Sequence, residues 1–208
     1  MAEEQVSLPA PFAYPSRPHV RRHGPQGYSK YRQYRNWLRD EFSFRCVYCL
    51  RRETWLTLRR DYQIDHFLPK SEHRDVERDY DNLVYACSEC NGTKAVKYLP
   101  SPESVAYGDY LRVDENGTIH PLDERGIGVA IIEALHLDAP EYTYLRRRII
   151  ETVGEASPRS KTLKWCLGYP DDLPNLSVEK KPKDNKRLNG IRESHYERKQ
   201  RGELPEYY

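Results

Sequence analysis

The pattern of apolar and polar positions predicts where regular structure begins in this chain. Between residues 28 and 44, apolar side chains recur at three- and four-residue intervals with arginine and lysine between them, which is the period of an amphipathic helix. Residues 1–27 contain prolines at positions 9, 11, 15, 18 and 25, which prevent regular helix. We therefore expect a flexible or loosely packed arm followed by one helix.

The middle of the chain predicts two strands and a helix. Residues 62–69 and 80–86 are rich in residues that favour strands, and residues 87–94 can begin a helix directly after the second strand. The expected order is strand, loop, strand and helix. Such a unit places the ends of the three elements around one small cleft.

The C-terminal half predicts a hairpin, two helices and a tail. Asn116-Gly117 is a strong tight-turn signal inside a hairpin expected over 105–122. Apolar stripes predict helices over 127–137 and 142–153, the second ended by Gly154. Beyond Pro170 the composition becomes mostly charged, which predicts a mobile tail or a helix ordered only by a partner. The expected organisation is an arm, a core with a basic helix, a hairpin with a helical extension and a charged tail, over residues 1–27, 28–100, 101–170 and 171–208.

Four of the five cysteines fall into two CxxC pairs. Cys46 and Cys49 are separated by 37 residues from Cys87 and Cys90. Two such pairs supply the four thiolates of a closed, tetrahedral structural Zn²⁺ site. A redox pair and an iron–sulfur cluster are the alternatives, and no thioredoxin-like pattern surrounds either pair. Cys166, between Trp165 and Leu167, is expected to be a buried apolar residue.

The composition favours a fold stabilised by a metal ion and a cytoplasmic location. Only 38% of the 208 residues are hydrophobic and 32% are charged, so a metal would help to hold the fold. No apolar stretch reaches membrane-spanning length, and residues 1–11 carry no signal core. We therefore expect a cytoplasmic protein without membrane contact, where paired cysteines are metal ligands more often than disulfides.

Basic charge is concentrated in one segment. The whole chain carries only +2, but residues 17–60 hold twelve basic and three acidic residues, a balance of +9. Tyrosine and tryptophan are interleaved with these charges, as suits a phosphate backbone with accessible bases. A solvated helix face is the alternative interpretation. The nucleic-acid contacts expected here are Arg32, Arg35, Arg39 and Arg45.

A set of polar residues on the predicted strands and helix suits phosphodiester hydrolysis. This reaction needs a base for water, a cation beside the phosphate and a stabilised leaving oxygen. His66 can be the base, and Asp65 and Asn91 offer oxygen ligands to Mg²⁺ or another divalent ion such as Mn²⁺. Asn82 is better placed to hold the loop after His66, and Lys94 to contact phosphate. The other histidine of this region, His73, lies in a polar loop and receives no role.

Taken in order, these residues resemble the HNH endonuclease family. The resemblance spans about 50 residues and rests on Cys46, Cys49, Asp65, His66, Pro69, Asn82, Leu83, Cys87, Cys90, Asn91 and Lys94. It implies an α+β fold with a ββα-metal core and a four-cysteine zinc site, elaborated by flanking helices and a hairpin. It also implies that His66 is the general base, Asn82 the middle residue and Asn91 the last residue of an HNN form of the motif.

A weaker resemblance extends downstream. Residues 115–119, 130–138 and 145–148 are similar to HNH proteins of retron and Septu anti-phage systems, which implies a defence role and a protein partner in a defence complex. The leading hypothesis is a metal-dependent endonuclease that cuts DNA in preference to RNA. A catalytically silent zinc-ribbon module that binds nucleic acid is the alternative from another class, and an RNA-directed nuclease is the third.

Overall fold

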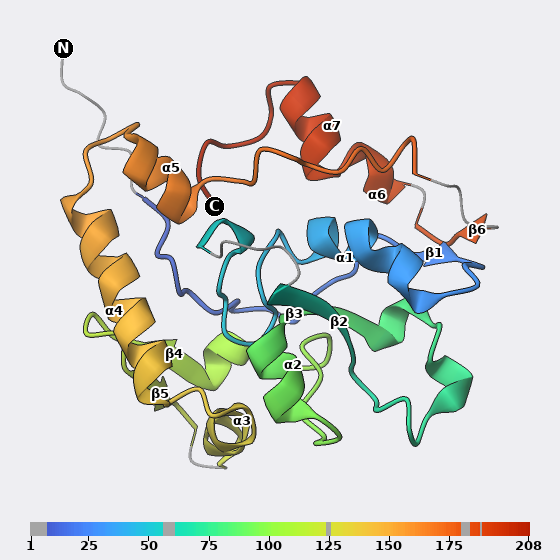
Figure 1. Cartoon of the computed structure of the whole chain (residues 1–208), viewed down its shortest axis with the longest axis horizontal. Coiled ribbons are helices and arrows are strands. Elements are labelled where there is room, and N and C mark those ends of the chain that lie inside the picture. The colour runs from blue at the N-terminus through green and yellow to red at the C-terminus, as the bar shows by residue number, and fades with distance from the viewer. Residues whose placement is uncertain (1–7, 56–60, 124–125, 180–183, 188) are drawn as a thin grey trace.

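Small antiparallel sheets surrounded by helices make up the part of the chain that the structure describes. The computed structural model describes residues 8–55, 61–123, 126–179, 184–187 and 189–208. Within these ranges there are three two-stranded sheets, which confirms the predicted α+β class (Figure 1). Residues 1–7 of the expected arm, Arg59 and Arg60 of the basic segment, and residues 180–183 and 188 of the tail lie outside the described residues.

The predicted strand–strand–helix unit is confirmed and forms the centre of the molecule. Strands β2 (Tyr62–His66) and β3 (Leu83–Cys87) pair antiparallel, and helix α2 (Ser88–Lys94) follows β3 without a break. All five residues of β3 are buried, as expected for a strand covered on both faces. The thiol sulfur of Cys87 accepts a hydrogen bond from the backbone N–H of Cys90, so this cysteine also caps α2.

One helix was predicted over residues 28–44, and a shorter helical segment is found. A 3-10 turn, η1 (Tyr31–Tyr34), leads into helix α1 (Arg35–Glu41), which ends before Ser43 and Phe44 adopt positive φ values of 52° and 58°. Helix α1 packs on β3 through Trp37 and Leu38, which are 1% and 0% exposed. In Figure 1 the β2–β3 ribbon lies between α1 and α2.

The hairpin and both downstream helices are confirmed, with shifted ends. The hairpin consists of β4 (Leu111–Val113) and β5 (Ile119–Pro121), and Gly117 turns it with a φ of 79°. Helix α3 (Ile127–Leu135) ends where His136 adopts a positive φ. Helix α4 (Pro140–Glu155) runs through Gly154, so the predicted break there is wrong: an exposed glycine in a last turn weakens a helix without ending it.

The remaining elements are short. Helix α5 (Lys161–Leu167) packs against α4 around Leu163 and Cys166, both fully buried, as expected for Cys166. The others are β1 (Pro25–Gln26), η2 (Glu53–Trp55), η4 (Arg74–Val76), η5 (Tyr80–Asn82), η6 (Tyr107–Asp109), β6 (Asp184–Asn185), α6 (Asn189–Arg192) and α7 (His195–Gln200).

The expected flexible arm packs against the rest of the chain at several positions between residues 8 and 27. Phe12 and Arg21 are each 6% exposed and His23 is fully buried, and β1 pairs with β6. The prolines prevent helix, as predicted, but they do not prevent burial of the side chains between them. The expectation of a loosely packed arm is therefore corrected for residues 8–27.

The expected mobile tail is also anchored where the structure describes it. The Asp40 carboxylate joins His23, at 2.7 Å, to His195 of α7, at 3.0 Å from its Nδ1. The ring of Tyr208 stacks on Tyr169 with 4.2 Å between ring centroids. The tail has few apolar residues, but buried polar contacts hold it in place. A prediction from the number of apolar residues cannot detect such contacts.

Glu41, beside Asp40, is held in the same buried polar network. Its carboxylate oxygens accept hydrogen bonds from the backbone N–H groups of Arg22 and His23, both at 2.9 Å, and from the His19 ring. Burial alone would raise the pKa of this carboxyl, but the His19 hydrogen bond and the charge of His23 outweigh burial and lower the pKa to about 2. The ionised form therefore stabilises the fold, and this stabilisation is lost as the pH falls from the ordinary value of 4.5 toward 2.

Glu41→Gln should therefore destabilise the protein more at neutral than at acid pH. The difference in free energy of unfolding between wild type and variant should shrink by about 1 kcal/mol between pH 7 and pH 4. Urea unfolding at both pH values measures this difference. Glu151→Gln, on the surface of α4, is the control and should show no such change. An equal loss of unfolding free energy in Glu41→Gln at both pH values would contradict the role of the ionised Glu41.

Candidate functional site

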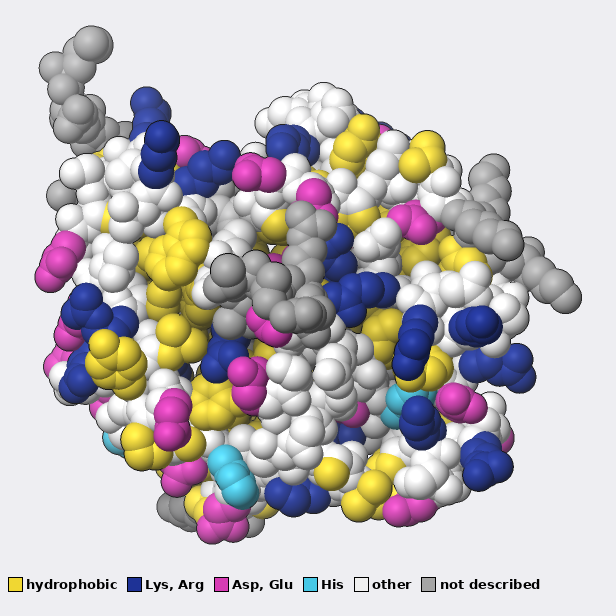
Figure 2. Space-filling model, viewed as in Figure 1, with side chains coloured by type: hydrophobic (Ala, Val, Ile, Leu, Met, Phe, Trp, Pro, Cys, Tyr) yellow, Lys and Arg dark blue, Asp and Glu magenta, His cyan; other side chains and the backbone are white. Residues whose placement is uncertain are grey.

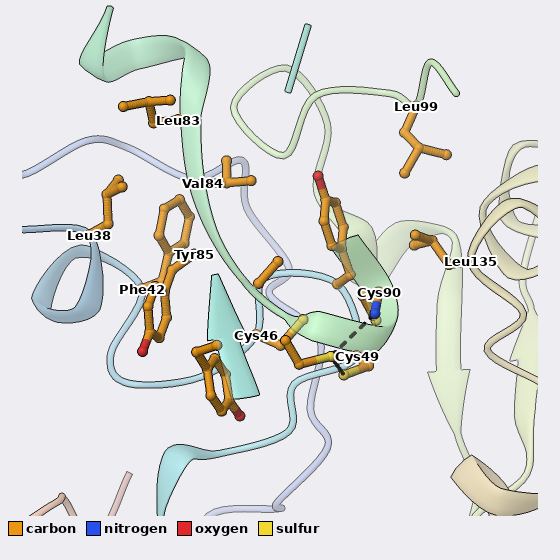
Figure 3. Close-up of a cluster of buried hydrophobic side chains, with 14 of the residues drawn as sticks. Leu38, Phe42, Cys46, Cys49, Leu83, Val84, Tyr85, Cys90, Leu99 and Leu135 are labelled. Atoms are coloured by element: carbon orange, nitrogen blue, oxygen red, sulfur yellow. Dashed lines mark hydrogen bonds between the residues drawn. The ribbon is translucent and has the colours of Figure 1, made fainter. Parts of the chain in front are cut away.

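The four paired cysteines converge in a buried cluster that can hold a metal ion. All four sulfurs lie within 4.8 Å of one another, and those of Cys49 and Cys87 are 3.7 Å apart. A tetrahedral ion with sulfur ligands at about 2.3 Å separates its sulfurs by about 3.8 Å, so the thiols are already at ligand spacing. Figure 3 shows Cys46, Cys49 and Cys90 beside the apolar core that contains Leu135.

Groups around the cysteines suit thiolate ligands. The Tyr142 hydroxyl lies 3.5 Å from the Cys90 sulfur, and the Arg51 guanidinium lies over the Tyr142 ring at 5.4 Å from its centroid. Four thiolates around a divalent ion leave excess negative charge, which a nearby cation and hydroxyl offset. The chemistry of this buried donor set fits a structural ion with no open position.

A separate open cleft lies along β2, between η1 and the second half of α2. It encloses about 1110 Å³. It brings together Asp65, His66 and Asn91 of the predicted site with Arg32 and Arg35 of the predicted basic helix. The remaining lining residues are Tyr31, Tyr62, Gln63, Ile64, Pro69, Lys70, Ser71, Gly92, Ala95 and Val96.

Asp65 is held rigidly at the inner wall of the cleft. The hydroxyl of Tyr48 donates to its Oδ2 at 2.6 Å, and the Lys94 ammonium lies 3.4 Å from Oδ1 and 3.3 Å from Oδ2. The residue is only 4% exposed. Burial raises the pKa of the Asp65 carboxyl, against the opposing effects of Lys94 and Tyr48. Because an ionised carboxylate has about four acceptor positions, Oδ1 keeps the capacity to bind a cation.

Lys94 is placed differently from the sequence-based expectation. Its side chain is fully buried, and the ammonium donates to the His66 carbonyl at 3.0 Å as well as to Asp65. It therefore cannot be the phosphate contact that the sequence suggested. The sequence placed Lys94 near the start of a helix, whereas it is the last residue of α2, and the direction of its side chain follows from the packing of α2 on β2.

His66 is oriented for one ring nitrogen to act as a base. Its Nε2 lies 3.1 Å from the Glu77 carbonyl oxygen, which can only accept, so Nε2 carries the hydrogen in the neutral ring and Nδ1 keeps the lone pair. Tyr31 packs edge-on against the ring at 4.6 Å between centroids. Burial lowers the pKa of His66, and Lys70 lowers it further against the Glu77 hydrogen bond, which favours the neutral imidazole.

The two asparagines of the motif have different surroundings. Asn82 accepts a hydrogen bond from the Leu68 N–H at 2.8 Å and donates to the Leu68 and Val76 carbonyls at 3.2 and 3.3 Å. It thus holds the loop between β2 and β3 in place. Asn91, in the middle of α2, lines the cleft and donates through Nδ2 to Oε1 of Gln63 at 2.5 Å.

Only two of the four arginines expected to bind nucleic acid reach the cleft. Arg32 lines it, and so does Arg35, which also donates to the Tyr62 carbonyl at 2.8 Å. Arg39 is 5% exposed and forms a two-bond ion pair with Glu53, with both distances at 2.8 Å. Arg45 faces a different hollow, beside Phe42 and Pro102. The prediction for Arg39 is corrected because its side chain is buried in this ion pair, whereas the role of Arg45 stays a prediction. The 3-10 turn before α1 and the end of α1 before Arg45 break the single helical face that the sequence suggested.

Several cleft residues were missed by the sequence analysis. Lys70 extends the basic wall, and its ammonium lies over the Tyr31 ring at 5.4 Å from the centroid. Gln63 shares a strand face with Asp65, a relation that the two-residue period of a strand could have revealed. Tyr48 lies between the two cysteines of the first pair and gives no sequence signal of its contact with Asp65. In Figure 2 a histidine is visible among lysine and arginine side chains beside the β2–β3 ribbon of Figure 1.

Comparison with known proteins identifies the segment that builds this site. The family model described as HNH endonuclease matches residues 46–97, which include both cysteine pairs and the ribbon and helix of the cleft. This confirms the resemblance to that family for the segment, and the segment is an HNH domain. A search of curated proteins found no match. Among the described residues, no helix has the length and apolar character needed to cross a membrane.

Removing the Lys94 ammonium should strongly destabilise the fold. Lys94→Met would leave the Asp65 carboxylate buried with the Tyr48 hydroxyl as its remaining side-chain donor, which should cost about 3 kcal/mol of unfolding free energy. Denaturant unfolding of the metal-loaded protein measures the loss. Lys97→Met, at an exposed position after the same helix, is the matched control and should change stability by less than about 0.5 kcal/mol. Equal stability of the two variants would show that the buried ion pair contributes nothing.

Proposed function

We propose that this protein is an HNH endonuclease that hydrolyses phosphodiester bonds, most readily in DNA, with a divalent ion at Asp65 and Asn91. The observation that carries the proposal is the meeting of Asp65, His66 and Asn91 in one open cleft that is also lined by basic residues. This hydrolysis requires a base, oxygen ligands for a cation, and positively charged side chains that contact the phosphate.

The oxygen donors fit a small divalent cation. Asp65 provides one carboxylate and Asn91 one carboxamide oxygen, and both line a cleft large enough for ligand water. Mg²⁺ and Mn²⁺ bind through such oxygens and retain several waters, so two protein ligands suffice. When bound, the ion would offset negative charge on the phosphate and the leaving oxygen.

The protein's own groups supply the rest of the chemistry. His66 accepts a proton from water at Nδ1, while the Glu77 carbonyl holds Nε2 and so fixes the ring. Tyr31 packs against that ring and limits its rotation. Asn82 acts as a positioning residue, because it holds the loop that carries Lys70 and Ser71 into the cleft wall.

We assign the cysteine cluster to a structural zinc ion. The sulfur spacing and complete burial support four thiolate ligands with no open position, so this ion braces the domain and takes no part in hydrolysis. The weaker downstream resemblance to anti-phage HNH proteins supports a defence role for the nuclease, with a protein partner.

Loss of the base should abolish cleavage while the fold persists. His66→Ala should slow cleavage of supercoiled plasmid by about 10²–10⁴-fold in the presence of Mg²⁺ or Mn²⁺, with nucleic-acid binding retained. The matched control is His73→Ala in the polar loop of the same ribbon, which should cut at close to the wild-type rate. Each variant should hold one zinc per chain by metal analysis, so that loss of fold is distinguished from loss of chemistry.

Two results would decide against this assignment. Equal cleavage rates for zinc-loaded His66→Ala and wild type would remove His66 from the reaction. Binding without cleavage by the wild type, with every divalent ion, would favour the zinc-ribbon binding module. A parallel assay with single-stranded RNA tests the preference for DNA, and faster cleavage of RNA would reverse that preference.

The corrected basic wall gives a second prediction. Arg32→Ala combined with Lys70→Ala should weaken DNA binding and reduce the slope of log affinity against log salt by about two, near one for each lost phosphate contact. Arg148→Ala, on the exposed surface of α4, is the single-charge control and should leave the slope unchanged. An unchanged slope in the double variant would show that the cleft wall does not contact the phosphate backbone.

A further inference from the structure

Helix α2 and strand β2 face each other through two parallel side-chain contacts. Gln63 and Asp65 lie two residues apart on strand β2 and so share a face of the strand. Asn91 and Lys94 lie three residues apart on helix α2 and so share a face of the helix. Asn91 donates to Gln63 at 2.5 Å, and Lys94 pairs with Asp65 at 3.3 Å. The second contact is buried, whereas the first lies at the surface of the cleft.

The contact between Gln63 and Asn91 determines which end of the Asn91 carboxamide is free. This group has an oxygen that can bind a cation and an NH₂ group that cannot. Because Nδ2 donates to Oε1 of Gln63, the oxygen Oδ1 is the end left for the cleft. The opposite arrangement, with Gln63 donating to Oδ1, would occupy the ligand oxygen and turn the NH₂ group toward the cation.

We infer that Gln63 is a positioning residue that orients the Asn91 carboxamide so that its oxygen faces the divalent ion. The inference rests on the proposed nuclease function. Gln63 lies on the same strand as Asp65, so one strand carries the charged ligand and the group that orients the neutral ligand. Hydrogen-bond partners of metal ligands usually change metal affinity by about 10–100-fold when they are removed.

Two substitutions separate hydrogen bonding from charge and size. Gln63→Met keeps a neutral side chain of similar length but removes the acceptor, so the dissociation constant for Mn²⁺ should rise by about tenfold. Gln63→Glu keeps an oxygen that can only accept, so it should retain Mn²⁺ affinity at the wild-type level or tighter. Gln200→Met, exposed at the end of α7, is the control for the substitution itself and should bind Mn²⁺ like the wild type.

The measurement is Mn²⁺ binding to the zinc-loaded protein without nucleic acid, followed by electron paramagnetic resonance of the free ion. The Mn²⁺ concentration that gives half-maximal plasmid cleavage should shift in parallel, with a smaller change in rate at saturating Mn²⁺. Zinc content and unfolding free energy verify that each variant is folded. A structural role alone would change stability without shifting the metal dependence.

A double-mutant cycle with Asn91→Ala completes the test. Once Asn91 is removed, Gln63→Met should cause no further loss of Mn²⁺ affinity, because there is no carboxamide left to orient. Equal Mn²⁺ affinity of wild type and Gln63→Met would overturn the inference, and so would the same loss of Mn²⁺ affinity with and without Asn91. In either case, cleavage by the wild type would leave the nuclease proposal intact. If the wild type neither binds Mn²⁺ nor cuts, the proposed function and this inference fail together.

Discussion

The structure depends on the four cysteines, which meet where the loop before β2 packs against the junction of β3 with α2. The backbone N–H of Val47 donates to the Tyr85 carbonyl at 3.0 Å, so the first cysteine pair is also tied to β3. Tyr48 follows directly and reaches Asp65 from this position. The contacts that hold the cysteine loop on β3 therefore also fix the carboxylate of the cleft, and movement of this loop would displace Asp65.

Charge in this chain has two distinct uses, and the geometry of the basic helix separates them. Arg39 is used internally, in a buried ion pair with Glu53, where removal of one partner would leave an uncompensated charge. Arg32, in the 3-10 turn that precedes α1, lines the cleft instead. A charge balance of +9 over residues 17–60 thus overstates the surface available to nucleic acid, because part of that charge stabilises the protein itself.

The core of the domain could be predicted because its signals are local. Strand periodicity, the two CxxC pairs and the position of Asn91 after Cys90 each depend on neighbours in sequence, and the structure has these elements where they were expected. The arm and the tail could not be predicted, since the Asp40 carboxylate joins His23 to His195, which lies 155 residues beyond Asp40. The cleft residues Gln63 and Lys70 were missed because their roles depend on how α2 and η1 pack around β2.

The choice of asparagine at the last motif position has a consequence for how ion and substrate bind. Asp65 shares its charge with Lys94, and Asn91 is neutral, so these three groups together offer a cation little net negative charge. In the proposed function, the phosphate of a bound nucleic acid would supply the missing charge, while Arg32 and Lys70 would contact its neighbouring phosphates. Binding of the ion and binding of the substrate then favour each other, and by linkage each must raise the affinity for the other by the same factor. Because the protein attracts the cation only weakly, the orientation of the Asn91 oxygen becomes more important. A carboxylate presents an oxygen in either orientation, whereas a carboxamide presents either an oxygen or an NH₂ group. A neutral carboxamide ligand therefore needs a hydrogen-bond partner that orients it.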